Sequence, residues 1–283
     1  MPEFVILGAS GQLGGAFAAS LGAAAAPLTR ADADFSDASA LELLLRRLQP
    51  AAVINCAAHN QVDALESDIG PGLAANFFLP TTLARLAQRH GWKLVHFSTD
   101  YVFGAESERR TPYREEDRPA PVNRYGQSKL MGEQAVLTLA PRALVFRVAH
   151  LFGECPGSAR KSLVTRFIER AQSGRPLLAS DQQYLNPTRV GDIVPVVIAL
   201  LRAGAQGLFH LTGEGQCSVA EFAAEVLRLA GQSARFEDKM DPRPAPRAAY
   251  TVLENSRLHA LGYPPLPHWQ QALRAELRGL ESA

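Results

Sequence analysis

Short apolar runs alternate with amphipathic stretches through the first half of the chain. The runs have the length of buried parallel strands and occupy residues 4–7, 26–29, 52–55 and 93–100. The stretches between them carry apolar residues at helical spacing, up to about residue 21 and over residues 37–48 and 73–90. This βαβαβαβ alternation predicts an α/β fold with a doubly wound parallel sheet, in which ligands bind at the carboxyl ends of the strands.

The second half of the chain loses this strict alternation after residue 153. Helices are expected over residues 163–173, up to residue 201 and over residues 219–230, with a strand at residues 208–211. Ser218 and Glu221 have the spacing of a capping box at the start of the last helix. We therefore divide the chain into a domain of residues 1–153 and a smaller one of residues 154–283, some segments of which return to the sheet.

A glycine-rich turn directly follows the first predicted strand, with Gly8, Gly11 and Gly14 spaced three apart before a helix. This is the Rossmann-like arrangement for a dinucleotide. The first glycine permits the tight turn, the second lets the backbone approach a pyrophosphate, and the third lets the helix pack closely. The pyrophosphate would lie on the helix N-terminus, where free N–H groups favour an anion. The same glycines also suit an ordinary turn before a helix.

The end of the second predicted strand distinguishes the two nicotinamide cofactors. An acidic residue there would bind a ribose 2′-hydroxyl, but Arg30 occupies the position, and arginine suits a 2′-phosphate. We therefore favour NADPH, with NADH as the alternative and a plain surface arginine as the simplest reading. Asp34 and Phe35 are expected beside the adenine. The small residues Cys56, Ala57 and Ala58 would let a nicotinamide ribose lie close to the third strand.

The pair Tyr125 and Lys129 carries the candidate chemistry, because residues four apart share one face of a helix. An ammonium about 4 Å from a phenol favours the phenolate by about 4 kcal/mol at an effective dielectric of about 20. This corresponds to a pKa lowered by roughly three units from about 10, which would allow proton exchange near neutral pH. Thr99, at a strand end, could bond the same oxygen that Tyr125 protonates.

Composition narrows the class of protein. The chain has 283 residues and a net charge of +1, which gives no sign of nucleic acid or an anionic membrane as partner. Cys56, Cys155 and Cys217 are too few and too far apart for a disulfide framework or a zinc ribbon. With no basic leader and no apolar run of about 18 residues, we expect a cytoplasmic protein. The charge-rich residues 106–118 are expected to form a solvated surface loop.

Together these motifs resemble those of extended short-chain dehydrogenases/reductases. Longer strings are similar to the dTDP-4-dehydrorhamnose reductase family, over nearly the whole chain. They are Gly11-Gln12-Leu13-Gly14, Val53-Ile54-Asn55-Cys56-Ala57-Ala58, Ser98-Thr99-Asp100-Tyr101-Val102-Phe103, Tyr125-Gly126-Gln127-Ser128-Lys129, Asn186-Pro187-Thr188 and Asn255-Ser256-Arg257-Leu258.

The resemblance implies reduction of a 4-keto nucleotide sugar by NADPH or NADH, giving dTDP-L-rhamnose in that family. Tyr125 would be the proton donor, Lys129 would lower its pKa and hold the nicotinamide ribose, and Thr99 would bond the carbonyl. Asn60, Val62, Thr99 and Asp100 would line the sugar pocket, and the second half would form the substrate-binding domain. The expected cofactor-binding residues are Gly8, Gly11, Gln12, Leu13, Gly14, Arg30, Asp34, Phe35, Cys56, Ala57, Ala58, Asn76, Tyr125 and Lys129.

Three residues leave the substrate open. His150 stands where the reductases commonly carry tryptophan against the sugar, so it could contact a sugar or be a core histidine. Arg243 and Arg247 could clamp a nucleotide pyrophosphate or belong to a solvated loop. The resemblance offers no convincing metal ligands, so no metal is assigned. A homodimer is allowed for.

Other functions on the same scaffold also remain open at this point. One is a non-catalytic NADP-binding subunit resembling the β subunit of methionine adenosyltransferase. Another is a nucleotide-sugar epimerase or dehydratase, although Asp100-Tyr101 after Thr99 argues against dehydration.

Overall fold

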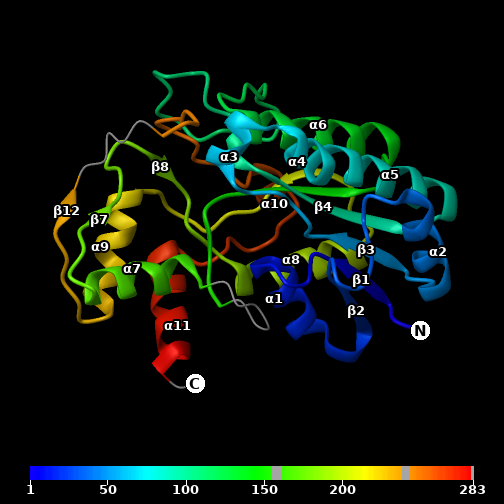
Figure 1. Ribbon diagram of the computed structural model, residues 1–283, viewed down its shortest axis with the longest axis horizontal. Coiled ribbons are helices and arrows are strands. Elements are labelled where there is room, and N and C mark those ends of the chain that lie inside the picture. The colour runs from blue at the N-terminus through cyan, green and yellow to red at the C-terminus, as the bar shows by residue number, and fades with distance from the viewer. Residues whose placement is uncertain (155–160, 238–242, 282–283) are drawn as a thin grey trace.

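A six-stranded, fully parallel sheet organises the molecule (Figure 1). The computed structural model describes residues 1–154, 161–237 and 243–281. The strand order is β10-β5-β4-β3-β1-β2. The strands are β1 (Phe4–Leu7), β2 (Ala25–Leu28), β3 (Ala52–Asn55), β4 (Lys93–Thr99), β5 (Leu144–Val148) and β10 (Gly207–His210). From β1 the chain adds β2 on one side of the sheet and then β3, β4, β5 and β10 on the other. The strand order therefore reverses between β1 and β3, which is where open α/β sheets bind their ligands.

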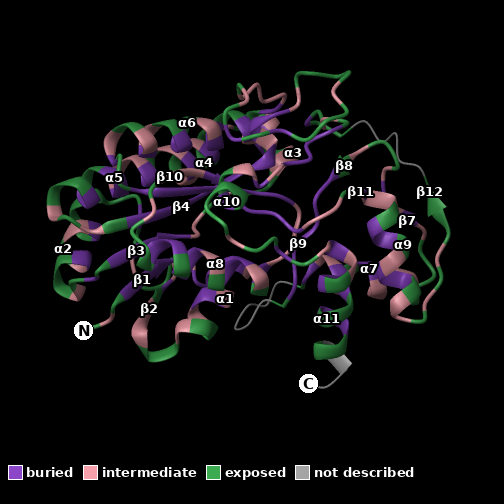
Figure 2. Ribbon diagram, turned by 180° about the vertical axis from the view of Figure 1, so that it is seen from behind, coloured by how far each residue is buried: buried purple, intermediate pink, exposed green. Residues whose placement is uncertain are grey.

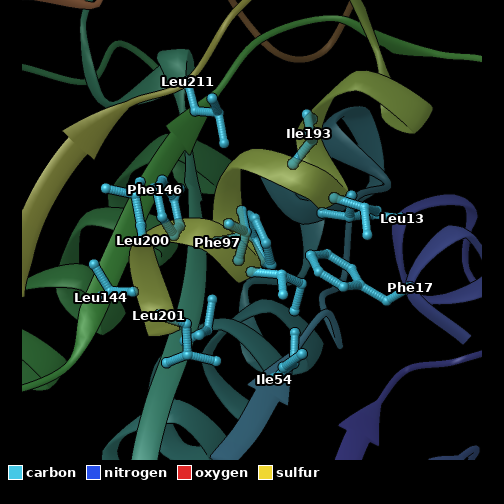
Figure 3. Close-up of a cluster of buried hydrophobic side chains, with 14 of the residues drawn as sticks. Leu13, Phe17, Ile54, Phe97, Leu144, Phe146, Ile193, Leu200, Leu201 and Leu211 are labelled. Carbon is cyan, nitrogen blue, oxygen red and sulfur yellow. The ribbon is translucent and has the colours of Figure 1, made fainter. Parts of the chain in front are cut away.

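Helices cover both faces of the sheet and bury two separate apolar layers. One layer packs α1 (Gln12–Leu21) and α8 (Val190–Arg202) against residues such as Ile54, Phe97 and Phe146 (Figure 3). The other packs α2 (Ala38–Leu48), α5 (Leu79–His90) and α6 (Arg124–Leu139) on the opposite face. Strands covered on both faces are expected to be apolar, as the fully buried β1 is throughout and β3 is up to its last residue, Asn55 (Figure 2).

The second half of the chain adds a smaller apolar cluster at one end of the molecule (Figures 1 and 2). It is formed by α7 (Leu163–Gln172), α9 (Val219–Leu229) and α11 (Trp269–Glu281), with Phe222 fully buried at its centre. Short strand pairs accompany it: β6 (Leu151–Phe152) with β9 (Thr188–Arg189), β7 (Leu177–Leu178) with β12 (Phe236–Glu237), and β8 (Tyr184–Leu185) with β11 (Cys217–Ser218). The same half returns β10 and α8 to the main sheet.

The helix predicted over residues 73–90 is interrupted. The chain instead forms α3 (Val62–Ser67), α4 (Gly70–Leu73), a π-helical turn η2 (Ala74–Phe78) and then α5. Pro80 has no N–H to donate to the carbonyl of Asn76 four residues earlier, so regular α-helical bonding cannot pass this point. The carbonyl of Asn76 faces Gly132 of α6, where an added Cβ would lie 1.9 Å from it.

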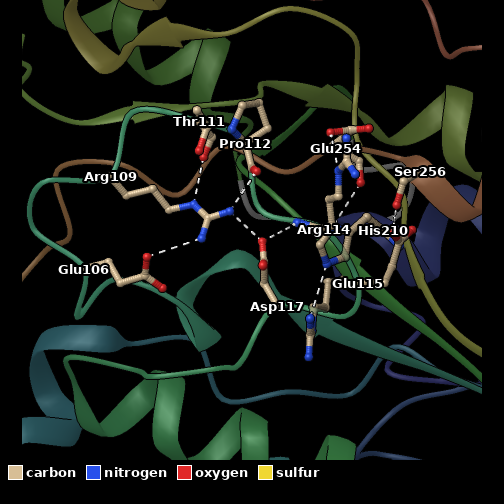
Figure 4. A network of polar contacts seen from close by, with 11 residues as sticks. Glu106, Arg109, Thr111, Pro112, Arg114, Glu115, Asp117, His210, Glu254 and Ser256 are labelled. Carbon is tan, nitrogen blue, oxygen red and sulfur yellow. Dashed lines mark hydrogen bonds and ion pairs between the residues drawn. The ribbon is translucent and has the colours of Figure 1, made fainter.

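Residues 106–118 form a mostly exposed loop, as their charge predicted, but two of its side chains are buried. Tyr113 is 1% exposed and Glu115 7% exposed, and the Tyr113 ring stacks on Phe103 at 4.0 Å between centroids. The segment also exchanges backbone hydrogen bonds with Val252 and Glu254, both 2.8 Å long. Arg109 joins the loop internally through Glu106 and Asp117 (Figure 4). Tyr113 therefore anchors this loop to the C-terminal half of the chain, and the ion pairs of Arg109 hold the loop together internally.

The part of the chain that the structure describes has neither a membrane-spanning helix nor a cluster of metal ligands. No helix in it is long and apolar enough to span a membrane. No group of three or more His, Cys, Asp or Glu in it is arranged to hold a metal ion. Cys56 and Cys217 are free thiols, and Cys155 lies outside the described residues.

Candidate active site

A cleft of about 620 Å³ opens at the carboxyl ends of β1 and β3, where the strand order reverses. Eight of the predicted cofactor-binding residues line it. They are Gly8, Gly11, Arg30, Asp34, Phe35, Cys56, Ala57 and Ala58. The cleft is therefore built from the glycine turn, the segment after β2 and the small residues after β3.

The first and third glycines of the turn are required by close packing. Gly8 has φ +80, and a Cβ there would lie 2.7 Å from the backbone nitrogen of Ala57. A Cβ on Gly14 would lie 2.3 Å from the carbonyl oxygen of Gly8. The turn thus holds β1, β3 and α1 at backbone contact distance, which leaves the N-terminus of α1 open to a bound anion.

Three of the expected cofactor residues have other roles in the structure. Asn76 is fully buried; its Oδ1 accepts from His59 N–H at 2.9 Å, and its Nδ2 donates to the carbonyl of His59 and to Ser128 Oγ. Leu13 is 8% exposed and belongs to the core under α1. Gln12 donates from Nε2 to the Gly153 carbonyl at 2.8 Å. Asn76 therefore shapes the cleft from behind, because its polar atoms are already used.

Several cleft residues escaped the sequence analysis. They are Ser10, Ala33, Ser36, His59, Gln61, Ala74, Ala75 and Leu79. Asn60, expected beside the sugar, also lines this cleft. His59 and Gln61 could have been found, because they follow Cys56–Ala58 directly along the chain. Ala74, Ala75 and Leu79 come from a helical segment further along the chain, and nothing in the sequence indicated that they line the cleft.

Tyr125 and Lys129 lie in the first two turns of α6, which Asn123 caps by accepting from Gly126 N–H at 2.8 Å. The Thr99 side chain acts on the pKa of the Tyr125 hydroxyl, and α6 packs against β4, so the end of β4 and the start of α6 meet as expected. Lys129 is 3% exposed, and its Nζ donates to the carbonyl of Phe97. The structure thus brings Thr99, Tyr125 and Lys129 together.

The electrostatics of this trio differ from the expectation that Lys129 lowers the pKa of Tyr125. Burial raises the pKa of Tyr125 above its usual range, and this outweighs the opposing effect of the neighbouring Thr99 side chain. The Lys129 ammonium is directed at the Phe97 carbonyl, and burial lowers its own pKa to about 8. The Glu133 carboxylate, one helical turn further along α6, acts in the opposite direction on Lys129.

Glu133 is itself held by a buried ion pair. Arg147 of β5 donates to both Glu133 oxygens, at 2.6 Å and 3.0 Å, and both side chains are 2% exposed. Arg147 Nη1 also lies 3.3 Å from His210 Nε2 on β10. Since buried charges are stable only when paired, this network fixes α6 against the strands that carry the site.

The expected sugar-pocket residues lie around the same edge of the sheet. Val62 begins α3 and is half-buried. Asp100 follows Thr99 directly and is 3% exposed, with both carboxylate oxygens bonded to threonine hydroxyls. His150 lies two residues beyond Val148, which pairs with Thr99 in the sheet.

His150 has the features of a strained, neutral side chain. Its φ is 41, in the left-handed region that non-glycine residues seldom adopt. The ring meets Phe222 edge-on at 5.4 Å, and burial lowers its pKa to about 4. Among the described residues its buried Nε2 has no hydrogen-bond partner. The imidazole therefore retains one unused polar atom at the end of β5.

The two arginines suggested as a pyrophosphate clamp are placed differently from each other. Arg247 Nη2 lies 3.1 Å from Asp63 Oδ1, and its guanidinium lies 5.8 Å from the Tyr101 ring centroid. Arg243 is exposed. Arg247 thus borders the site while already paired, and both arginines act to lower the pKa of Tyr101, so the clamp stays a prediction.

The parallel sheet, its glycine turn and the Thr99, Tyr125 and Lys129 trio define the class of protein: an extended short-chain dehydrogenase/reductase. Comparison with known proteins narrows this class. The family model described as "RmlD substrate binding domain" matches residues 2–281. The chain belongs to this family, that of the dTDP-4-dehydrorhamnose reductases.

Individual relatives agree with the family. The dTDP-4-dehydrorhamnose reductase of Mycobacterium tuberculosis is 37% identical, over 97% of this chain and 92% of its own length. A probable dTDP-4,6-dihydroxy-2-methyloxan-3-one 4-ketoreductase of Streptomyces antibioticus is 39% identical, over 85% and 82%. The crystal structure of dTDP-4-dehydrorhamnose reductase from Bacillus anthracis in complex with NADP has a TM-score of 0.92 at 28% identity, over 99% of this chain and 100% of that one.

Proposed function

We propose that this protein is an NADPH-dependent reductase of a 4-keto nucleotide sugar, with dTDP-4-dehydrorhamnose as substrate and dTDP-L-rhamnose as product. The observation that carries the proposal is the meeting of Thr99, Tyr125 and Lys129 beside a dinucleotide-sized cleft. Relatives that span nearly the whole chain carry the same activity in their names.

The residues present fit a nicotinamide dinucleotide. Gly8 and Gly11 leave room for a pyrophosphate at the N-terminus of α1, and the cleft has the volume that a large ligand needs. When bound, the cofactor supplies the hydride that reduces the ketone. Arg30, exposed at the cleft, suits the 2′-phosphate of NADPH. NADH is the alternative cofactor.

The protein's own groups handle the proton and the geometry. Tyr125 donates its phenolic proton to the oxygen of the reduced carbonyl, which needs one proton for each hydride received. Lys129, buried one helical turn beyond Tyr125 and cationic below its pKa of about 8, is assigned to the ribose hydroxyls of the cofactor. Thr99 contacts the same oxygen and orients Tyr125.

The sugar and its nucleotide are assigned to the edge where the two halves of the chain meet. Val62, Asp100 and His150 border this region, and His150 contributes one neutral ring nitrogen as a hydrogen-bonding atom. A histidine offers less apolar area and more polar specificity than a large aromatic ring would. His150 is therefore the residue to vary when testing which sugar is preferred.

A homodimer is part of the proposal. Phe78 on η2 is 58% exposed and Met131 on the adjoining α6 is 39% exposed. Large apolar side chains exposed on neighbouring helices are the kind of surface that a second copy covers. Light scattering after gel filtration should give twice the chain mass, and Phe78→Glu should return the mass to that of one chain.

The direct test is to incubate the protein with NADPH and a panel of 4-keto nucleotide sugars, following the loss of NADPH absorbance. Turnover of dTDP-4-dehydrorhamnose, with dTDP-L-rhamnose identified by mass and chromatography, is the expected result. Absence of turnover with every sugar, together with intact NADPH binding, would favour a non-catalytic subunit instead. The nucleotide-sugar epimerase of Thermus thermophilus is 22% identical and shares only the fold.

A further inference from the structure

The carboxylate of Asp100 joins the two halves of the chain directly behind the proposed reacting groups. Its Oδ1 accepts from Thr99 Oγ1 at 3.1 Å, and its Oδ2 accepts from Thr251 Oγ1 at 2.6 Å. Thr251 is 6% exposed and belongs to the segment after residue 243, whereas Thr99 ends β4. One buried carboxylate therefore holds a hydroxyl from each half.

The hydrogen count at Thr99 has a consequence for Tyr125. A threonine hydroxyl carries a single proton, and Thr99 donates it to Asp100 while accepting from the Tyr101 N–H at 3.2 Å. The neighbouring Tyr125 hydroxyl can then act toward Thr99 only as a donor, because Thr99 has no second proton to give. While Asp100 is ionised, Thr99 has no proton to offer a substrate oxygen or a tyrosinate.

A protonated Asp100 would reverse this arrangement. A carboxylic acid has one O–H of its own, which could be donated to Thr99 Oγ1 while the other oxygen still accepts from Thr251. The Thr99 proton would then be released toward Tyr125 and the carbonyl. The negative charge beside a phenol that must become a phenolate would be removed as well.

We propose that Asp100 and Thr251 are positioning residues that set the direction of the Thr99 hydrogen bond, and that neutral Asp100 is the form that supports reduction. This inference rests on the proposed function. It assigns to Thr251, from the second half of the chain, a part in the reaction that no motif indicates.

The surroundings of Asp100 allow it to change protonation. Burial raises its pKa to about 6, against the hydrogen bonds from Thr251, Thr99 and the backbone. Tyr101 of η3 (Asp100–Val102) and Tyr125 of α6 are the titratable groups that face it. Two cations are near Tyr101: Arg247, which lies over its ring and is paired with Asp63, and Arg243, which also acts on the Tyr101 pKa.

The test is the pH profile of kcat between pH 5 and 8, with saturating NADPH and dTDP-4-dehydrorhamnose. In the wild type, kcat should fall as pH rises through about 6, approaching tenfold per unit. Thr251→Val removes a bond that favours ionised Asp100, so its midpoint should move up by roughly one unit. Thr251→Ser keeps the hydroxyl and should restore the wild-type midpoint. Asp100→Asn should remove this inflection.

Urea unfolding of each variant confirms that it is folded before its profile is read. Two results would overturn this inference and leave the proposed function standing. One is an Asp100→Asn variant whose kcat and pH inflection equal those of the wild type. The other is a Thr251→Val variant whose kcat profile keeps the wild-type midpoint. Failure of the wild type to reduce the sugar would overturn both. A change confined to KM, with kcat profiles unchanged, would indicate substrate contact in place of positioning and would also overturn it.

Discussion

At the scale of single residues, burial governs the ionisation of three groups of the proposed site, Tyr125, Lys129 and Asp100. It raises the pKa of Tyr125, lowers that of Lys129 to about 8 and raises that of Asp100 to about 6. Each shift favours the uncharged form, because a low-dielectric surrounding penalises charge. Lys129 and Asp100 can therefore exchange protons near neutral pH. Tyr125 needs a stabilising partner to lose its proton, because its pKa is raised.

Replacing Tyr125 by phenylalanine tests the proton donor. The ring still packs edge-on against Tyr101, at 5.5 Å between centroids, so the fold and the cofactor cleft should be kept. Turnover should fall by roughly 10²- to 10⁴-fold, the usual contribution of a positioned acid, while the Kd for NADPH changes little. Tyr263→Phe, which removes a hydroxyl packed against the core under the sheet, is the matched control. Undiminished turnover in Tyr125→Phe would end the assignment.

The lowered pKa of Lys129 predicts a pH dependence of cofactor binding. Lys129 is cationic below about pH 8 and neutral above it, so NADPH should bind more weakly as pH rises through that value. Fluorescence titration of NADPH between pH 6.5 and 9.5 measures this. Lys129→Met should bind weakly at all these pH values, without the inflection. An identical inflection in Lys129→Met would assign it to another group.

At the scale of elements, contact between α6 and η2 positions the site. Gly132 faces the Asn76 carbonyl, and Gly126 lies so close to the Tyr101 carbonyl that a Cβ would be 2.2 Å from it. Both glycines share α6 with Tyr125 and Lys129. Close approach of this helix to its neighbours thus determines how near Tyr125 comes to Thr99.

Gly132→Ala should therefore destabilise the fold, although alanine favours helices. The added Cβ would meet the Asn76 carbonyl at 1.9 Å, and such overpacking costs about 1–3 kcal/mol. Gly279→Ala in α11 is the control, since nothing lies within 4 Å of its added Cβ. It should stabilise by roughly 0.5–1 kcal/mol. Urea unfolding compares them, and equal shifts for both variants would contradict the packing argument.

The sequence predicted the elements whose burial pattern is local. Apolar runs located β1, β3 and β4, and motif position placed Thr99 and Tyr125 at neighbouring ends. The π-turn was missed because its cause, Pro80, acts through a carbonyl that a periodicity pattern does not register. The bond between Asp100 and Thr251 joins residues 151 positions apart and has no local signal. Buried polar roles, such as that of Asn76, depend on partners from distant segments.

At the scale of the whole molecule, two fully buried histidines lie inside the sheet. His96 on β4 bonds through Nδ1 with Asn55 Nδ2 at 3.1 Å, and His210 on β10 lies beside Arg147. Burial lowers the pKa of His96 well below its usual range and that of His210 to about 3, with the nearby cations acting in the same direction. Folding therefore excludes protons that the unfolded chain binds below about pH 6.5.

The sign of this linkage predicts acid destabilisation. Because both pKa values are lowered by folding, the stability they contribute is complete above about pH 6.5 and is lost as pH falls. Each histidine should lower the free energy of unfolding by about 1.4 kcal/mol for every pH unit below that value. Asp100, whose pKa is raised by folding, takes up a proton below about pH 6 and should offset the loss from one of them. His96→Asn keeps an acceptor for Asn55 but cannot take up the proton. Urea unfolding at pH 6.5, 5.5 and 4.5 gives the free energy of unfolding at each pH. Its dependence on pH should be shallower in this variant by about 1.4 kcal/mol per pH unit. The same dependence in both proteins would contradict the assignment of this effect to His96.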